Sequence, residues 1–295
     1  MMRHIEGQVR SPDGLSLYYQ SWLPQTPAKA TIGMIHGLGS HSGQFENMVQ
    51  ILVPCGYGVY GLDLRGHGKS PGQRGYINSW AEFRGDVDSL WQVMGHQHPT
   101  LPRFMLGHSL GAVVVLDYAL RSPSSLPGII TMAPALKPAG VPPLRLAIGQ
   151  MLSQVWPRFS LNTGIPENAG SHRTRGTAYL QDPLRHRKGT ARLATEFLQA
   201  SHWVQTHLHH WQSPILTVHG SKDIVALPEG SRILFEQIPI RDKEQREYEG
   251  AFHDLHQDSN TCQIVRDMVH WLDRHTARDP IQSSCRVHCP AGQAE

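Results

Sequence analysis

The stretch that decides the fold runs from Arg103 to Leu120 and contains RFMLGHSLGAVVVLDYAL. Its beginning, Arg103–Leu106, is a short apolar run typical of a buried strand, and Ala112–Leu120 is an apolar run typical of a helix. Between them, Gly107–Gly111 matches Gly-x-Ser-x-Gly, the sharp turn that exposes a serine between a strand and a helix. We therefore expect Ser109 to be a nucleophile at the tip of this turn. The alternative is a serine that only caps the helix behind a glycine turn.

Strand and helix patterns alternate on both sides of this stretch. The expected strands are Ala30–Ile35, Gly58–Leu62, Arg103–Leu106, Gly128–Met132, Pro214–His219 and Arg246–Glu249. The expected helices are Phe45–Val53, a helix beginning after Ser79 as its N-cap, Ala112–Leu120, Ser231–Gln237 and Thr261–Arg274. This alternation predicts an α/β fold, with a mostly parallel central sheet and helices on both faces. A hairpin around Asp13-Gly14 comes before it.

The alternation breaks between about residues 135 and 212. This stretch is rich in proline and has helix-like pieces at Leu144–Val155 and Gly189–Trp203. We interpret it as a helical cap inserted over the sheet, within one domain that spans residues 1–278. Residues 279–295 have no periodic pattern and are expected to form a flexible C-terminal tail.

Composition excludes several other classes of protein. Lys and Arg exceed Asp and Glu by only three charges, which gives no case for binding nucleic acid. No apolar run approaches the length of a membrane span, and Met1–Arg10 lacks the apolar core of a secretory signal. The four cysteines are too few and too scattered for a disulfide framework, which favours a reducing cytoplasm.

A neutral serine is a poor nucleophile and needs a base, which in turn needs a group that orients it. After such a turn the expected chain order is Ser, then Asp or Glu, then His, each on a loop after a strand. Asp223 follows the strand Pro214–His219, and His253 follows the strand Arg246–Glu249. Asp223 could also be an ordinary turn residue. His256 is a rival base, but His253 stands closer to the end of its strand.

The oxyanion of an acyl-transfer reaction needs backbone donors. One expected donor is the N–H of Leu110, directly after the nucleophile. The other is the N–H of Leu38, because Gly37 and Gly39 let the loop after the first parallel strand bend inward. His36, at the start of that loop, is expected to be a structural histidine.

These motifs resemble the monoacylglycerol lipase and lysophospholipase group of α/β-hydrolases. The resemblance covers about Leu15 to Asp273, and the insertion contributes a piece of the group's cap in Asp182-Pro183-Leu184. It implies a serine carboxylesterase that acts on a single acyl chain esterified to a small polar group, most simply a monoacylglycerol. The residues that carry it are His36–Gly43, Asp63–Ser70, Gly107–Gly111, Asp223, and Tyr248-Glu249-Gly250 with His253.

The insertion also supplies candidates for substrate binding. Four apolar residues have helical spacing and are expected to line an acyl tunnel: Leu144, Ile148, Leu152 and Trp156. The alternative is a cap helix packed on the core. The expected partner is a small lipid ester, with transient contact between the cap and a membrane surface.

No cofactor or metal is expected. The glycine-rich segment Asp63–Ser70 lacks the spacing of a phosphate-binding loop, which leaves a structural turn. Histidines 207, 209 and 210 have no spacing that would bring all three to one metal ion. Cys285, His288 and Cys289 lack a second ligand pair.

Four other functions stay open at this point. The substrate could be a lysophospholipid or a peptide amide, or the enzyme could be an esterase of broad specificity. In a different class, the chain could be a catalytically silent lipid-binding protein, although an intact set of Ser, Asp, His and oxyanion loop argues against silence. The expected location is the cytoplasm, peripheral to membranes.

Overall fold

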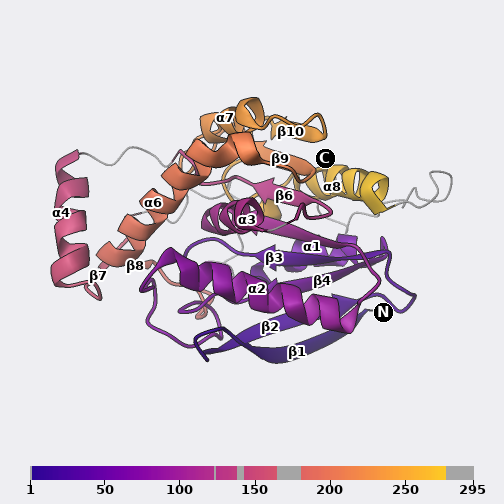
Figure 1. Ribbon diagram of the computed structural model, residues 1–295. Coiled ribbons are helices and arrows are strands. Elements are labelled where there is room, and N and C mark those ends of the chain that lie inside the picture. The colour runs from indigo at the N-terminus through magenta and orange to yellow at the C-terminus, as the bar shows by residue number, and fades with distance from the viewer. Residues whose placement is uncertain (1, 123, 138–142, 165–180, 277–295) are drawn as a thin grey trace.

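A computed structural model describes residues 2–122, 124–137, 143–164 and 181–276, with the side chains of residues 143–148 left out. Its centre is an eight-stranded sheet in the order β1-β2-β4-β3-β5-β6-β9-β10 (Figure 1). The six strands from β4 to β10 run parallel, whereas β1 pairs antiparallel with β2 and β2 antiparallel with β4. The strands are β1 (Arg3–Arg10), β2 (Ser16–Leu23), β3 (Ala30–Ile35), β4 (Tyr57–Leu62), β5 (Arg103–His108), β6 (Ile129–Met132), β9 (Ile215–Gly220) and β10 (Lys243–Tyr248).

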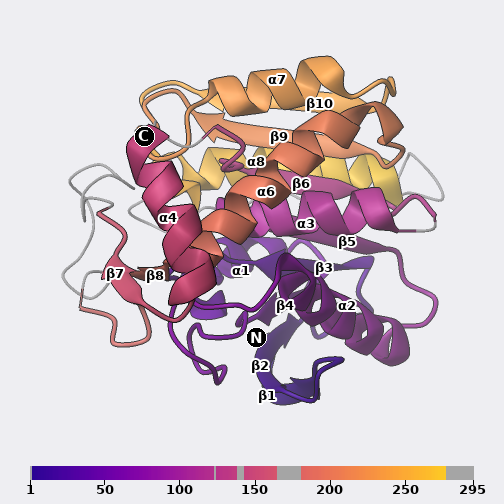
Figure 2. The same ribbon diagram turned by 60° about the vertical axis from the view of Figure 1, so that its left-hand side comes forward.

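Helices cover both faces of this sheet, which explains why the inner strands are apolar along their whole length. Every residue of β3, β4, β6 and β9 is buried. One face packs against α1 (Glu46–Leu52) and α8 (Thr261–Thr276). The other packs against α2 (Trp80–Gln97), α3 (Leu110–Arg121), α6 (Ala191–His207) and α7 (Glu229–Gln237), as Figures 1 and 2 show. The predicted α/β fold is confirmed.

Local differences from the sequence prediction have simple causes. The N-terminal hairpin expected around Asp13-Gly14 is present, and its pairing extends from Arg10 and Ser16 at the turn to Arg3 and Leu23. Ser79 does precede α2, but its side chain makes no capping hydrogen bond. Instead, the N–H of Trp80 donates to the Glu196 carboxylate at 2.8 Å. A distant helix therefore supplies the acceptor that the local sequence was expected to provide.

The stretch between β6 and β9 contains the elements at the left of Figure 1. They are α4 (Pro143–Val155), the short antiparallel strands β7 (Ser160–Asn162) and β8 (Lys188–Thr190), and α6. Helix α6 contacts α4 at one end and packs against α3, so it ties this stretch to the sheet. The tail at 279–295, including Cys285, His288 and Cys289, lies outside the described residues.

The cysteines correct one expectation. Cys55, just after α1, and Cys262, in the first turn of α8, are buried and each takes part in a disulfide. The prediction that the chain is reduced is therefore wrong for these two residues. Spacing along the sequence could not show this, because bridging depends on which cysteines meet in space. Among the helices of the described ranges, none has both the length and the apolar character needed to cross a bilayer.

Candidate active site

Ser109 stands at the junction of β5 and α3 in a strained backbone conformation. Its φ of +56° lies in a region that residues other than glycine rarely adopt. The flanking glycines make the turn possible: a Cβ on Gly107 would lie 2.5 Å from the Cα of Ala112, and one on Gly111 would collide with the carbonyl of Ile35. The expected strand, turn and helix are therefore present around Ser109, with its side chain at the carboxyl end of the sheet.

The structure brings Ser109, His253 and Asp223 into one hydrogen-bonded line. The Nε2 atom of His253 lies 2.8 Å from Ser109 Oγ, and its Nδ1 lies 2.6 Å from Asp223 Oδ2. All three residues are less than 10% exposed. Because Asp223 can only accept, His253 carries its proton on Nδ1, and its Nε2 is left to accept a proton from Ser109.

Asp223 is held in place by more bonds than the one to His253. Its Oδ1 accepts from the backbone N–H groups of Val225 and Ala226 at 2.8 and 3.0 Å. Burial by itself would raise the pKa of Asp223, but the charge of His253 and hydrogen bonds from His219 and His253 hold it well below its usual range. Asp223 is therefore ionised whenever His253 is charged.

His219 is a supporting residue that sequence reasoning missed. It lies buried in β9, and its Nε2 donates to Asp223 Oδ2 at 3.1 Å and to the carbonyl of Ala226 at 2.9 Å. Its Nδ1 accepts from Ser231 Oγ at 2.6 Å, which sets the tautomer. The only sequence signal was a histidine at the end of an otherwise apolar strand, four residues before Asp223.

The loop expected to hold the second oxyanion donor lies against Ser109. A Cβ on Gly37 would be 3.1 Å from Ser109 Cβ, so glycine is needed for this approach. Leu38 is half-buried, and Leu110, the first residue of α3, is buried. His36 donates from Nδ1 to the Gly37 carbonyl and accepts the N–H of Leu64 at Nε2, and burial lowers its pKa to about 4. It makes the bonds of a structural histidine, as expected.

His256, the rival base, packs elsewhere. Its ring makes edge contacts with Phe45 and His108, at centroid distances of 5.5 and 4.8 Å. His253 is the histidine that bonds both Ser109 and Asp223.

The predicted tunnel residues are not all enclosed. Leu152 is half-buried, but Trp156 follows the last residue of α4 and is 59% exposed, with its ring against Phe159. The helix ends at Val155, so helical spacing no longer sets the direction of Trp156. Leu144 and Ile148 fall among the side chains outside the described residues.

The structure also describes two other groups that the sequence offered as possible sites, the three histidines near residue 207 and the glycine-rich segment Asp63–Ser70. The rings of His207, His209 and His210 lie at one end of α6, 3.9 to 6.3 Å apart, and no metal-ligand group involving them occurs among the described residues. In the glycine-rich turn, Asp63 accepts the N–H groups of Ser42 and Lys69, which ties this turn to the segment His36–Gly43 after β3.

Comparisons with known proteins show which family the sequence and the fold resemble. The sequence model of the family described as "Serine aminopeptidase, S33" matches residues 26–260. A monoacylglycerol lipase of Mycolicibacterium smegmatis is 28% identical over 264 residues, which cover 89% of this chain and 94% of the relative. Monoglyceride lipase of Homo sapiens is 29% identical over 270 residues, covering 90% and 89%. The crystal structure of Paleococcus ferrophilus monoacylglycerol lipase has a TM-score of 0.80 and 32% identity, covering 88% and 99%.

Proposed function

The chain belongs to the serine hydrolase family described as serine aminopeptidase, S33, and we propose that it hydrolyses monoacylglycerols to a fatty acid and glycerol. It resembles monoglyceride lipases over nearly the whole length of the relatives compared. The observation that carries the proposal is the hydrogen-bonded line from Asp223 through His253 to Ser109. That line needs no metal ion or cofactor to act on an ester.

In the proposed mechanism, Ser109 Oγ attacks the ester carbonyl while His253 Nε2 takes its proton. Asp223 accepts the Nδ1–H of His253 throughout and stabilises the imidazolium that forms. The N–H groups of Leu38 and Leu110 donate to the oxyanion. Glycerol leaves with the proton from His253, and the acyl group stays on Ser109. Water then attacks the acyl-enzyme, again giving its proton to His253, and the fatty acid leaves as Ser109 recovers its hydrogen.

The inserted stretch at about residues 135–212 is proposed to act as the cap that holds the acyl chain. Leu144, Ile148 and Leu152 are proposed for the wall of the tunnel, with Trp156 at its outer rim. Exposed apolar side chains occur in α4, directly after it and in β7, as expected for a surface that touches lipid aggregates: Met151, Val155, Trp156 and Leu161. The cytoplasmic location stays a prediction, and the bridged Cys55 and Cys262 count against it.

The test is a hydrolysis panel on one purified sample. It compares monoacylglycerols of several chain lengths with lysophospholipids and short nitrophenyl esters. We expect the highest kcat/KM on a medium or long monoacylglycerol. A clear preference for lysophospholipid would replace the headgroup assignment, and equal rates on all substrates would indicate an esterase of broad specificity.

A fluorophosphonate probe separates catalysis from silent binding. The probe reacts with an activated serine whatever the natural substrate, so labelling at Ser109 is expected in the native chain and absent from Ser109→Ala. A chain that binds lipid but does not react with the probe would be a lipid-binding protein, and the proposal would fail.

A further inference from the structure

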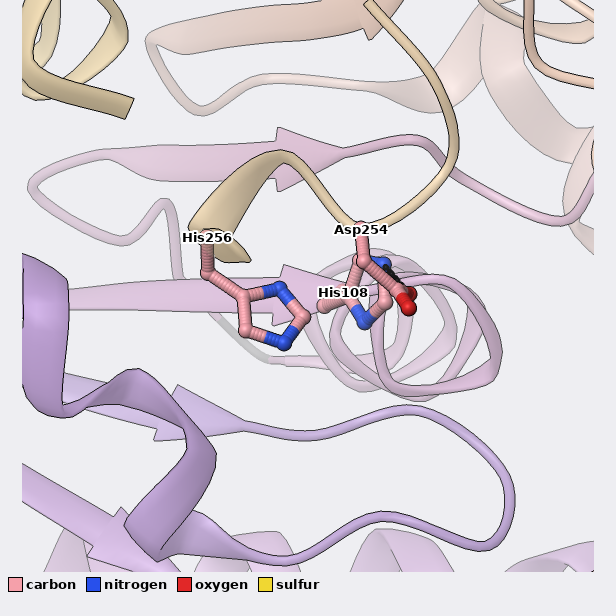
Figure 3. A group of neighbouring side chains, drawn as sticks. All are labelled: His108, Asp254 and His256. Carbon is pink, nitrogen blue, oxygen red and sulfur yellow. Dashed lines mark ion pairs between the residues drawn. The ribbon is translucent and has the colours of Figure 1, made fainter. Parts of the chain in front are cut away.

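Three side chains that the hydrolytic mechanism does not use meet beside the active site. His108, at the end of β5, and Asp254 and His256, in the segment between β10 and α8, point toward one another, as Figure 3 shows. One possible metal-ligand atom from each lies within 4.8 Å of the others, and His108 Nε2 is 3.7 Å from Asp254 Oδ1. All three residues are more than 90% buried. Among the residues that the structure describes, this is the one such group of histidine, cysteine and acidic residues.

We propose that His108, Asp254 and His256 bind a zinc ion and that this ion inhibits the enzyme. Two imidazoles and a carboxylate form a familiar three-ligand zinc set, which leaves a fourth position for water. Zinc bonds of about 2.0–2.1 Å in a tetrahedral site put ligand atoms roughly 3.3 Å apart. The pair His108–Asp254 is already near that separation. His256 stands in a three-residue turn, Leu255–Gln257, and its ligand atom lies within 4.8 Å of the other two, so it has to move inward by at most about 1.5 Å.

Inhibition follows from where these ligands stand in the chain. His108 directly precedes Ser109, and Asp254 directly follows His253. The Nε2–H of His108 donates to the carbonyl of His253 at 3.1 Å. A metal ion on that nitrogen replaces its proton, so the hydrogen bond is lost. The backbone of His253 then loses this support while its neighbour Asp254 is fixed on the ion, and the Nε2 of His253 must stay 2.8 Å from Ser109 Oγ for the proton transfer.

The inhibitory part of this inference rests on the proposed role of Ser109 and His253, whereas the binding part does not. The experiment therefore measures both. The full chain is stripped with EDTA, passed through a desalting column and titrated with zinc chloride. Bound zinc is measured by calorimetry and elemental analysis, and the rate is followed with a nitrophenyl ester. We expect one zinc ion per chain at this site and at least a tenfold loss of rate that EDTA reverses.

Two variants remove single ligands with little change in side-chain shape or size, His256→Gln and Asp254→Asn. Each is compared with its own metal-free rate, and each should need at least tenfold more zinc for half-inhibition. Metal-free thermal unfolding checks that each is folded, and either folded variant is sufficient for the test. If neither folds, calorimetry of the native chain decides, because magnesium prefers oxygen ligands and should not compete with zinc at an imidazole site.

The matched control replaces the other histidine group, His207, His209 and His210, by Gln. This control should bind and respond to zinc at the proposed site as the native chain does. If the control loses the inhibition while His256→Gln and Asp254→Asn keep it, the effect belongs to the surface histidines and the proposal is overturned. If the native chain binds no zinc, the proposal is overturned as well. It is also overturned if neither ligand variant folds and magnesium competes with zinc for the native chain. Zinc bound at this site with an unchanged rate overturns the inhibition.

Discussion

The Nε2 atom of His41 lies 2.7 Å from Oδ2 of Asp182, so a contact joins two segments 141 residues apart. The same carboxylate oxygen accepts a hydrogen bond from the Gln44 side chain at 2.6 Å. Four residues after Asp182, the N–H of His186 donates to the carbonyl of Gly39 at 3.0 Å. Asp182 and His186 of the inserted stretch therefore both hydrogen-bond to the loop that contains Leu38, the proposed oxyanion donor.

Asp182→Ala should lower kcat by about tenfold while KM for a short ester changes little. Losing a charged hydrogen-bond partner of this kind costs roughly 1.5–3 kcal/mol, and part of that cost should appear as a loosened oxyanion loop. Steady-state kinetics with a nitrophenyl ester measure it. Asp182→Asn, which keeps one acceptor oxygen for Gln44, is the control and should lose less. A rise in KM alone would assign Asp182 to substrate binding instead.

Ser109→Ala should abolish ester turnover and leave the fold intact. Removing the nucleophile of such a triad costs about 10⁶ in kcat. Turnover and far-ultraviolet circular dichroism are measured on the same sample. If more than about 1% of the native rate remains, the nucleophile is another residue.

Asp223→Asn should lower kcat by about 10⁴, because an amide cannot stabilise the imidazolium and favours the wrong tautomer of His253. In the native enzyme the pKa of the Asp223 carboxyl is held well below its usual range. Its titration should therefore cause no change of rate with pH above pH 4. The acid limb should instead report His253, which must be neutral to accept the proton of Ser109. A native-like rate for Asp223→Asn would make Asp223 an ordinary turn residue.

Folding stability should fall as the pH drops from about 6.5 to 4, because histidines are buried in the neutral state. Burial lowers the pKa of His36 and of His186 from 6.5 to about 4. In this window the unfolded chain binds protons that the folded chain does not, which favours unfolding. Each such histidine adds at most about 1.4 kcal/mol of lost stability per pH unit. Urea unfolding of His186→Gln at pH 7 and pH 5 should show a smaller drop than the native chain, and an unchanged drop would contradict the assignment.

Leu152→Asp should reduce the preference for long acyl chains and largely spare acetate esters. Each buried methylene of the acyl chain contributes about 0.8 kcal/mol, so a tunnel makes kcat/KM rise with chain length before it levels off. The measurement is kcat/KM over a series of esters. Equal losses on short and long esters would place Leu152 in the structural core and remove the tunnel assignment.

The sequence by itself determined the features that depend on short-range pattern. Alternating apolar runs predicted the parallel strands, and Ala30–Ile35 has the same bounds in the structure. The glycines around Ser109 predicted the sharp turn, because only a residue without a side chain fits so close to a neighbouring backbone. Positions after strands singled out Asp223 and His253, since the carboxyl ends of parallel strands meet at one edge of the sheet.

Only the tertiary structure decided the contacts between distant segments. His219 behind Asp223 and Asp182 against His41 leave no periodic trace in the sequence, and neither does the fact that Cys55 and Cys262 are disulfide-bonded. The same holds for Glu196, which takes the capping role expected of Ser79. Hydrophobic period and turn chemistry report a residue's immediate neighbours along the chain, whereas these pairings depend on how α6, the inserted stretch and the sheet pack together.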